Sequence, residues 1–287
     1  MSSLKSFSKV AVLYWFMLMP CSSSATAVDS IEPKVLTFGV VPQQAASTLA
    51  KGWAPVLAEL SQNANLNLQF ATAPDIPTFE MRLAKGEYDI AYMNPYHFTV
   101  FHESPGYIAL AKEQDKYLKG LIVVRKDSSI SKLAELDGKS LAFPAPAAFA
   151  ASVIPRAILK QQGVAHNTKY VGSHDSVYLA VAQGLVDAGG GVGRTFKNMD
   201  GDVTQRLRVL WKTPGYTPHA IATHPRVSKQ SREQLLSQLQ ALSTTSKGRA
   251  LLAGLGFKAM EAAQNSDWDD IRALSLSELN EPLKGSH

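Results

Sequence analysis

Short apolar runs alternate with longer stretches of helical periodicity along most of the chain. Runs rich in β-branched and aromatic residues predict strands, and apolar positions three or four residues apart predict amphipathic helices. The predicted strands lie at 35–41, 66–72, 88–93, 140–143, 169–171 and near 186, and the predicted helices at 47–62, 76–85, 131–136, 147–162 and 174–184. This alternation is typical of an α/β fold in which helices flank the sheets.

Two extended stretches, 107–125 and 206–224, interrupt the alternation. The first predicts antiparallel pairing around a polar tip at 113–119, and the second is broken by two prolines and a glycine. We expect both to be hinge crossings between two lobes, each a mixed sheet flanked by helices. The expected division is lobe 1 at 28–124 and 214–287, closed by helices at 229–242, 246–253 and 267–274, and lobe 2 at 125–213.

The first 27 residues have the pattern of a secretory signal peptide. Two lysines precede an apolar run at 10–19, and an Ala-Thr-Ala cleavage site follows at 25–27. We therefore expect export to the periplasm with a cleaved leader. In the alternative, Cys21 becomes the acylated first residue of a lipoprotein, although the proline before it fits that signal poorly.

Composition and charge exclude several classes of function. The formal net charge is +5, and lysine and arginine are interspersed with aspartate and glutamate, so no nucleic-acid partner is expected. No apolar run after the leader approaches the length of a membrane span. The single cysteine lies in the leader, so no disulfide is expected in the mature chain. We expect a soluble globular protein that acts as a monomer.

The sequence offers no pattern for catalysis or for metal binding. Paired catalytic carboxylates, a G-x-S-x-G elbow and zinc spacing are missing. The glycine run at 189–193 lacks the spacing of a dinucleotide loop and predicts backbone that passes close to a neighbouring strand or a ligand. We expect no catalysis, no cofactor and no metal. The alternative among enzymes is a periplasmic hydrolase built on the same two lobes, and the absence of these catalytic patterns argues against it.

Three segments place polar or aromatic residues where predicted strands end, which is where α/β sheets hold small ligands. The segment 86–98 supplies Tyr92, Asn94 and Tyr96, and the segment 144–152 begins a helix whose free amides favour an anion. The third segment, 169–174, ends at His174, which follows a serine suited to be an N-cap. Arg194, after the glycine run, is suited to hold an oxyanion. Each feature also has a purely structural interpretation, as a core tyrosine, an empty helix start, a packed histidine or a surface arginine.

Three segments in order carry a resemblance to a known family: YDIAYMNPYHF, LAELDGKSLAFPAPAAFAASVIPRAILKQQGV and YVGSHDSVYLAVAQGLVDAGGG. Together they resemble the phosphate/phosphite/phosphonate-binding family of periplasmic solute-binding proteins, which serve ABC importers. The resemblance extends from Val35 to the last helices. It implies a type 2 periplasmic-binding fold of two α/β lobes, with the ligand between them and no catalysis.

The resemblance also implies roles for particular residues. A loop tyrosine of the family falls at 92–96, and the histidine of its G-(S/T)-H-D motif, which touches the ligand oxyanion, matches His174. In two places the sequence departs from the family pattern. Where the family has the helix-start string D-P-x-S-T-S, residues 145–149 are Ala-Pro-Ala-Ala-Phe, and the family's acidic residue that can meet a ligand amine corresponds to Arg194. Each lost hydroxyl weakens oxyanion binding by about 1 kcal/mol or more. Phosphonate and a smaller or more apolar solute both remain open as the ligand.

The sequence thus predicts an extracytoplasmic solute-binding protein that closes on a small ligand, such as a phosphonate-like oxyanion, and delivers it to an ABC importer. The predicted ligand-binding residues are Gln43, Gln44, Tyr92, Asn94, Tyr96, Ala148, Phe149, His174 and Arg194. The expected partners are this small molecule and the importer's membrane subunits. In the alternative function, a periplasmic sensor of the same fold docks on a membrane histidine kinase or cyclase.

Overall fold

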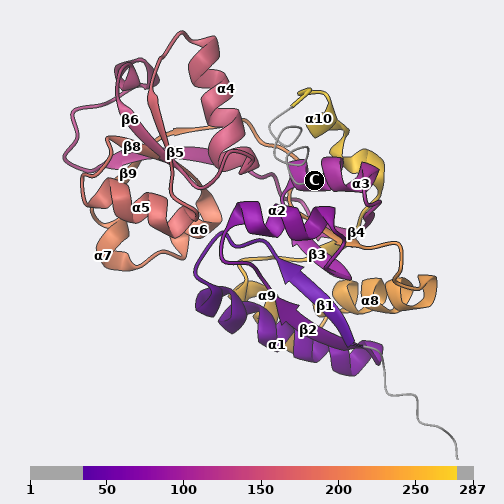
Figure 1. Cartoon of the computed structure of the whole chain (residues 1–287). Coiled ribbons are helices and arrows are strands. Elements are labelled where there is room, and N and C mark those ends of the chain that lie inside the picture. The colour runs from indigo at the N-terminus through magenta and orange to yellow at the C-terminus, as the bar shows by residue number, and fades with distance from the viewer. Residues whose placement is uncertain (1–34, 277–287) are drawn as a thin grey trace, which may run out of the picture. The chain divides into compact units, whose positions relative to one another are not determined.

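The computed structural model describes residues 35–276, which fold around two mixed sheets (Figure 1). In this part of the chain, a six-stranded sheet has the order β11-β4-β10-β3-β1-β2, with β1 (Val35–Val40), β2 (Asn67–Ala71), β3 (Ile90–Met93), β4 (Ile108–Glu113), β10 (Ala220–Thr223) and β11 (Met260–Ala262). A five-stranded sheet has the order β7-β6-β8-β5-β9, with β5 (Gly120–Arg125), β6 (Ser140–Phe143), β7 (Asn167–Tyr170), β8 (Ala188–Val192) and β9 (Leu207–Lys212). The predicted signal peptide and Cys21 lie outside the described residues.

Helices flank both sheets, so the predicted fold class is confirmed. They are α1 (Ala46–Ala64), α2 (Ile76–Ala84), α3 (Pro95–Glu103), α4 (Ile154–Gln161), α5 (His174–Ala182), α6 (Gly193–Lys197), α7 (Gly201–Thr204), α8 (Lys229–Leu242), α9 (Ser246–Gly254) and α10 (Asp269–Arg272), with 3-10 turns at Leu133–Leu136 and Asn265–Trp268 and a π-helical segment at Phe149–Val153. Helices α2 and α3 lie on one side of the six-stranded sheet, and α1, α8 and α9 on the other (Figure 1). None of the helices at 35–276 is long and apolar enough to cross a bilayer.

Strand β5 shows how the alternation of side chains fills two layers of core. Ile122 and Val124 pack in the same cluster as Leu159 of α4, whereas Leu121 and Val123 pack with Val177 of α5. Successive residues of a strand point to opposite faces of the sheet. The continuous apolar run of β5 therefore marks a strand that is buried on both faces.

The directions of the strands bring several loop residues to one edge. Strands β1, β2 and β3 are parallel, and so are β6, β7 and β8. Strand β10 is antiparallel to both β3 and β4, so β4 runs in the direction of β3. The loops that follow β1, β3 and β4 and the loop that precedes β10 therefore lie at the same end of the strands. This end is the usual place for ligands in α/β sheets.

The predicted antiparallel pairing within 107–125 is wrong. Strand β4 belongs to the six-stranded sheet, whereas β5 pairs with β8 and β9 in the five-stranded sheet. The position 124/125, where we placed the lobe boundary, falls within β5, and residues 114–119 connect the two sheets. Two apolar strands around a polar tip look like a hairpin in sequence, but here each finds its partners far along the chain.

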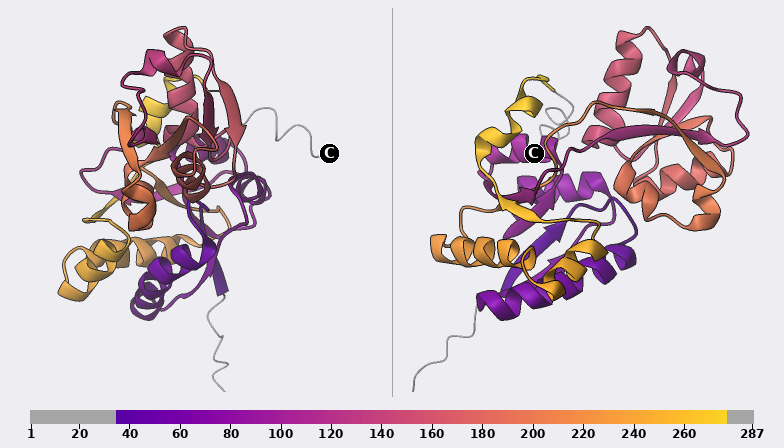
Figure 2. Two further views of the ribbon diagram at one scale, coloured as in Figure 1. Left: turned by 90° about the vertical axis from the view of Figure 1, so that its left-hand side faces the viewer. Right: turned by 180° about the vertical axis from the view of Figure 1, so that it is seen from behind.

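The second crossing lies at 213–219, between β9 and β10. It pairs with the first crossing, because the backbone amide of Leu118 donates to the Tyr216 carbonyl at 2.7 Å and the Tyr216 amide donates back at 3.0 Å. The two crossing segments run next to each other between the sheets (Figure 2). The connection between the sheets is thus a short two-stranded ribbon.

The glycine run forms the interior of β8, where close packing excludes side chains. A Cβ atom at Gly190 would lie 1.9 Å from the carbonyl oxygen of Ala151, and one at Gly191 would lie 2.1 Å from the Tyr178 hydroxyl. From the sequence, either a neighbouring strand or a ligand could explain the close approach that these glycines permit. The structure shows instead that the π-helical segment and α5 press directly onto β8.

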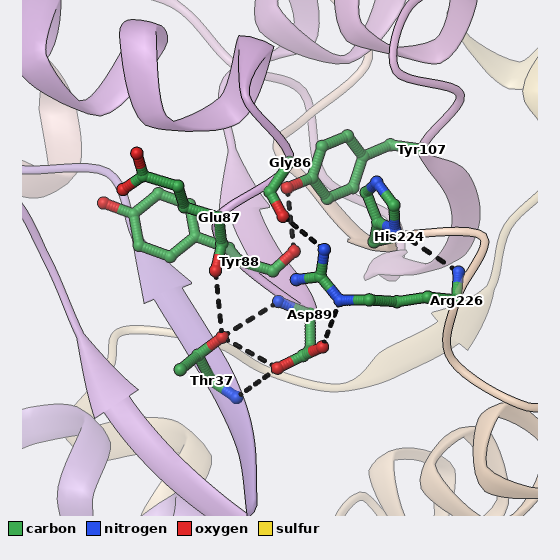
Figure 3. A network of polar contacts seen from close by, with 8 residues as sticks. All are labelled: Thr37, Gly86, Glu87, Tyr88, Asp89, Tyr107, His224 and Arg226. Carbon is green, nitrogen blue, oxygen red and sulfur yellow. Dashed lines mark hydrogen bonds and ion pairs between the residues drawn. The ribbon is translucent and has the colours of Figure 1, made fainter.

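A buried polar network fixes the start of β3 (Figure 3). Asp89 accepts hydrogen bonds from the amide and hydroxyl of Thr37, both at 2.9 Å, and pairs with Nε of Arg226 at 2.6 Å. Burial by itself would raise the pKa of Asp89, but the hydrogen bonds from Arg226 and Thr37 outweigh it and lower that pKa. Asp89 therefore links β1, β3 and the segment after β10 as a structural carboxylate.

Candidate functional site

A cavity of about 380 Å³ is lined by residues from the ends of strands in both sheets. Gln43 comes from the loop after β1, Tyr92 from β3 and Glu113 from the end of β4. Arg194 follows β8, and Lys212 ends β9. A cavity of this size at strand ends, with a few convergent polar groups, is the usual form of a small-molecule site.

Arg194, which follows β8, contacts two residues of the six-stranded sheet in this cavity. Its Nη1 atom donates to the Tyr92 hydroxyl at 2.6 Å, and its Nη2 atom donates to the buried carboxylate of Glu113. The guanidinium carbon lies 4.3 Å from the ring centroid of Phe257. Nε of Arg194 is buried and has no hydrogen-bond partner among the described residues. The positive charge predicted for this position is thus present, but a carboxylate already accompanies it.

Tyr92 and His219 form a neutral stacked pair next to Arg194. Their rings are 4.9 Å apart and inclined by 16°. Burial raises the pKa of the Tyr92 hydroxyl, and burial, assisted by Arg194, lowers the pKa of His219 well below its usual value. Nε2 of His219 is 3.1 Å from the Gln43 amide nitrogen, which donates to the neutral ring. These groups therefore offer hydrogen bonds rather than charge.

A second, very small cavity lies where the resemblance places the ligand oxyanion. Its volume is about 10 Å³, about the room that one water molecule needs. Asn94, Phe149 and His174 line it, together with Gln43 and His219, which line the larger cavity as well. The three loops singled out in the sequence thus meet at one point.

His174 is neutral and held by its neighbours. Burial lowers its pKa to about 3, and its Nδ1 atom lies 3.2 Å from the hydroxyl oxygen of Thr195. Its backbone amide donates to the Gln43 carbonyl at 3.0 Å. His174 therefore ties the start of α5 to the loop after β1 and contributes no formal charge.

Apolar side chains fill the helix start at 144–152. Ala148 and Phe149 are buried, and the Phe149 ring packs edge-on against Tyr216 at 5.3 Å between centroids. The side-chain amide of Asn94 donates to the Ala147 carbonyl at 3.3 Å. Asn94 also caps α3 through the His97 amide, so the predicted loop after β3 is a helix. The Asn94 side chain and the Ala147 carbonyl therefore already have partners within the protein.

Two of the predicted site residues line neither of these two cavities. Gln44 hydrogen-bonds Asp175 and lines a third cavity, of about 80 Å³, together with Gln43, Tyr92 and Arg194. Tyr96 packs in the core of the six-stranded sheet and accepts a hydrogen bond from Thr99 at its carbonyl. Ala148 lines only the smaller cavity of the two.

Sequence reasoning missed several residues that line the larger cavity. Glu113 and the lysines 116 and 119 lie in the polar tip, for which the sequence predicted no ligand contact, and Lys197 and Lys212 lie at the ends of α6 and β9. His219 also lines the cavity, and its position directly before a buried strand is a sequence signal that could have indicated a site. In residues 35–276, no group of three or more His, Cys, Asp or Glu residues is arranged to hold a metal.

Comparisons with known proteins agree with this geometry. A family model for the periplasmic substrate-binding protein of phosphonate ABC transporters matches residues 38–268. The phosphate-import protein PhnD of Mycolicibacterium smegmatis is 23% identical over 203 residues, and the match covers 63% of this chain and 63% of that protein. The chain thus spans less than two thirds of the length of this curated relative.

Two solved structures have the same fold. PhnD1 from Prochlorococcus marinus, in complex with methylphosphonate, superposes with a TM-score of 0.78 at 20% identity, over 87% of this chain and 99% of that one. The binding-protein component of an ABC phosphonate transporter from Pseudomonas aeruginosa gives a TM-score of 0.78 at 19% identity, over 86% and 87%. Since the family model covers most of the sequence, this chain belongs to the family of periplasmic substrate-binding proteins of phosphonate ABC transporters.

Proposed function

We propose that this chain binds a small organic or inorganic phosphoryl anion in the 380 Å³ cavity and delivers it to the membrane subunits of an ABC importer. The single observation that carries this proposal is the position of Arg194. Its guanidinium enters a cavity at the strand ends of both sheets, where several lysines supply further positive charge. An arginine in such a place is well suited to bind phosphonate or phosphate oxygens through two hydrogen bonds.

We further propose that the two sheets are the cores of two lobes that close on the ligand. The crossings at 114–119 and 213–219 are the hinge in this proposal, and the loops around Gln43 and His174 are the contact between lobes. A ligand favours the closed form only by the contacts that it gains there. Export to the periplasm and action as a monomer complete the proposal. The sensor alternative has no support from the comparisons: the Mycolicibacterium smegmatis relative is named a phosphate-import protein, and a relative from Prochlorococcus marinus is named a probable ABC transporter phosphite-binding protein.

Isothermal titration calorimetry of the protein tests this function. The panel is phosphate, phosphite and methylphosphonate, with sulfate and acetate as anions of other chemistry. We expect one binding site per chain and a clear preference for phosphoryl anions. Equal binding of sulfate and acetate would contradict the proposed selectivity. Delivery is then tested in proteoliposomes that contain the permease and ATPase of the importer, in which the liganded protein should stimulate ATP hydrolysis more than the free protein.

A further inference from the structure

The helix-start position has neither the room nor the charge for a phosphoryl group. The cavity there holds about 10 Å³, and buried Phe149 and the neighbouring alanines fill the surrounding space. None of the described residues that line it carries a hydroxyl group or a formal positive charge; its polar members are amides and imidazoles. A ligand that fits this chain therefore needs other contacts for its anionic group.

The larger cavity adjoins this position and has far more space. Gln43, Leu118, Val192 and His219 line both cavities, so the two are neighbours. A volume of about 380 Å³ falls in the range of sites for organic molecules of moderate size. In this conformation phosphate or methylphosphonate would fill only part of it. A ligand favours closure by the contacts that it makes with both lobes, and a larger molecule can make more of them.

The charges around the larger cavity favour an anion. Arg194 and four lysines line it, at positions 116, 119, 197 and 212, against the single carboxylate of Glu113. The four lysines are exposed. Lys119, Lys197 and Lys212 form no ion pair with any residue between 35 and 276. An excess of cations around a concave surface raises the local concentration of anionic ligands.

The rest of the lining is apolar or aromatic. Leu118, Leu121 and Met260 line the cavity beside the ring of Phe257. Tyr117 also lines the cavity. It is 68% exposed, more than the other large hydrophobic side chains described between residues 35 and 276. Exposed aromatic and aliphatic groups next to a cavity offer contact area to an apolar part of a ligand.

We propose that the ligand is an organophosphonate or phosphate monoester that carries an aromatic or similarly bulky apolar group. The anion is bound by Arg194 and the surrounding lysines, and the apolar group lies against Tyr117, Leu118 and Met260. This inference rests on the proposed function and specifies its substrate class. Such a ligand differs from phosphate or methylphosphonate because its apolar group supplies part of the binding affinity.

Calorimetry with matched ligands tests the inference on the full chain. Phenylphosphonate and methylphosphonate share the anionic group, and benzyl alcohol carries a ring without it. We expect phenylphosphonate to bind at least about tenfold more tightly than methylphosphonate, a difference of about 1.4 kcal/mol, and benzyl alcohol to bind at least tenfold more weakly than phenylphosphonate. A smaller ratio of the two phosphonates overturns the inference and leaves the proposed function intact. No binding of phosphate or of either phosphonate contradicts both.

Matched variants assign the preference to this cavity. Tyr117→Ser should reduce the ratio of the two phosphonate affinities at least threefold, whereas Tyr170→Ser, at another exposed tyrosine outside the cavity, should leave it unchanged. The double change Lys197→Met and Lys212→Met should weaken both phosphonates by a similar factor, and Lys160→Met, at an exposed lysine of α4, should weaken neither. A phosphonate ratio that is insensitive to Tyr117→Ser overturns the placement of the apolar group.

Discussion

Arg194, just after β8 of one sheet, donates a hydrogen bond to the buried carboxylate of Glu113 at the end of β4 of the other. This ion pair joins residues 81 positions apart in the sequence. It leaves the strongest cation of the cavity already paired before a ligand arrives. A phosphoryl anion must therefore share or replace Glu113 as the partner of Arg194, and anion affinity depends on this carboxylate.

Replacement of Glu113 by glutamine should strengthen binding of an anionic ligand. The change keeps the size of the side chain and removes a negative charge that an incoming anion would meet at short range. We expect the affinity for methylphosphonate to rise by about tenfold in calorimetry. Glu261→Gln is the control, because Glu261 pairs with Lys112 outside the cavity and its loss should leave the affinity unchanged. An unchanged affinity in Glu113→Gln would show that the carboxylate does not compete with the ligand.

The stability of the protein should fall in mild acid because His174 is buried without charge. Its pKa in the folded chain is about 3, against about 6.5 in an unfolded chain. Between these values only the unfolded chain binds the proton, so this contribution to stability is complete above about pH 6.5 and is lost as the pH falls toward 3. His219 acts in the same direction.

Urea unfolding at pH 7 and pH 4.5 measures this effect. We expect His174 to account for roughly 2–3 kcal/mol of the difference in free energy of unfolding between the two pH values. His174→Gln removes the titrating ring, so the variant should show a smaller difference than the wild type by that amount. If the variant and the wild type lose the same free energy, the ring is not held neutral in the folded state.

The fold could be predicted from the sequence where the pattern is local. The strands at β1, β2 and β6 and the helices α1, α2, α5 and α8 lie close to their predicted bounds, because each has a clear period and a turn or cap at its ends. The sheet membership of β4 and β5 could not be predicted, since their apolar patterns are equivalent and only pairing with distant strands distinguishes them. Likewise, Asn94 was expected in a loop, but it caps a helix that Pro95 begins.

The candidate site was predictable only in part, for a related reason. Residues at strand ends, such as Tyr92, His174 and Arg194, could be identified because the end of a strand is visible in sequence. The partners of Arg194 could not, because Glu113 and Phe257 reach it through folding and belong to segments without a motif. The sequence also could not show that Phe149 fills the space at the helix start, because this depends on how the segments pack.

The glycine in the middle of β8 should be intolerant of any side chain. In Gly190→Ala, the new methyl group would lie 1.9 Å from a backbone oxygen, so β8 and the π-helical segment would have to separate. We expect a loss of about 3 kcal/mol in the free energy of unfolding, measured by denaturant titration. Gly254→Ala is the matched control, because nothing lies within 4 Å of its added methyl group. Equal stability of the two variants would contradict the packing described for β8.

The network around Asp89 should contribute strongly to stability. Asp89→Asn removes the charge that pairs with Arg226 and weakens the bonds from Thr37, and we expect a loss of about 3 kcal/mol. Asp127→Asn removes an exposed partner of Arg125 and should change the free energy of unfolding by less than about 1 kcal/mol. Thermal or urea unfolding at pH 7 compares the two. A loss no larger than that of the exposed pair would show that the network is not structural.

The most direct test of the central claim compares methylphosphonate binding to Glu113→Gln with binding to the double variant Glu113→Gln, Arg194→Gln. In this background, removal of the arginine leaves no unpaired buried carboxylate, so unfolding experiments should show both variants folded. Because hydrogen bonds to a charged group contribute about 1.5–3 kcal/mol, we predict tight binding to the single variant and a loss of at least about tenfold in the double variant. Equal affinity in both, or no phosphoryl anion bound by either, would contradict the assignment of Arg194 as the anion-binding group of this protein.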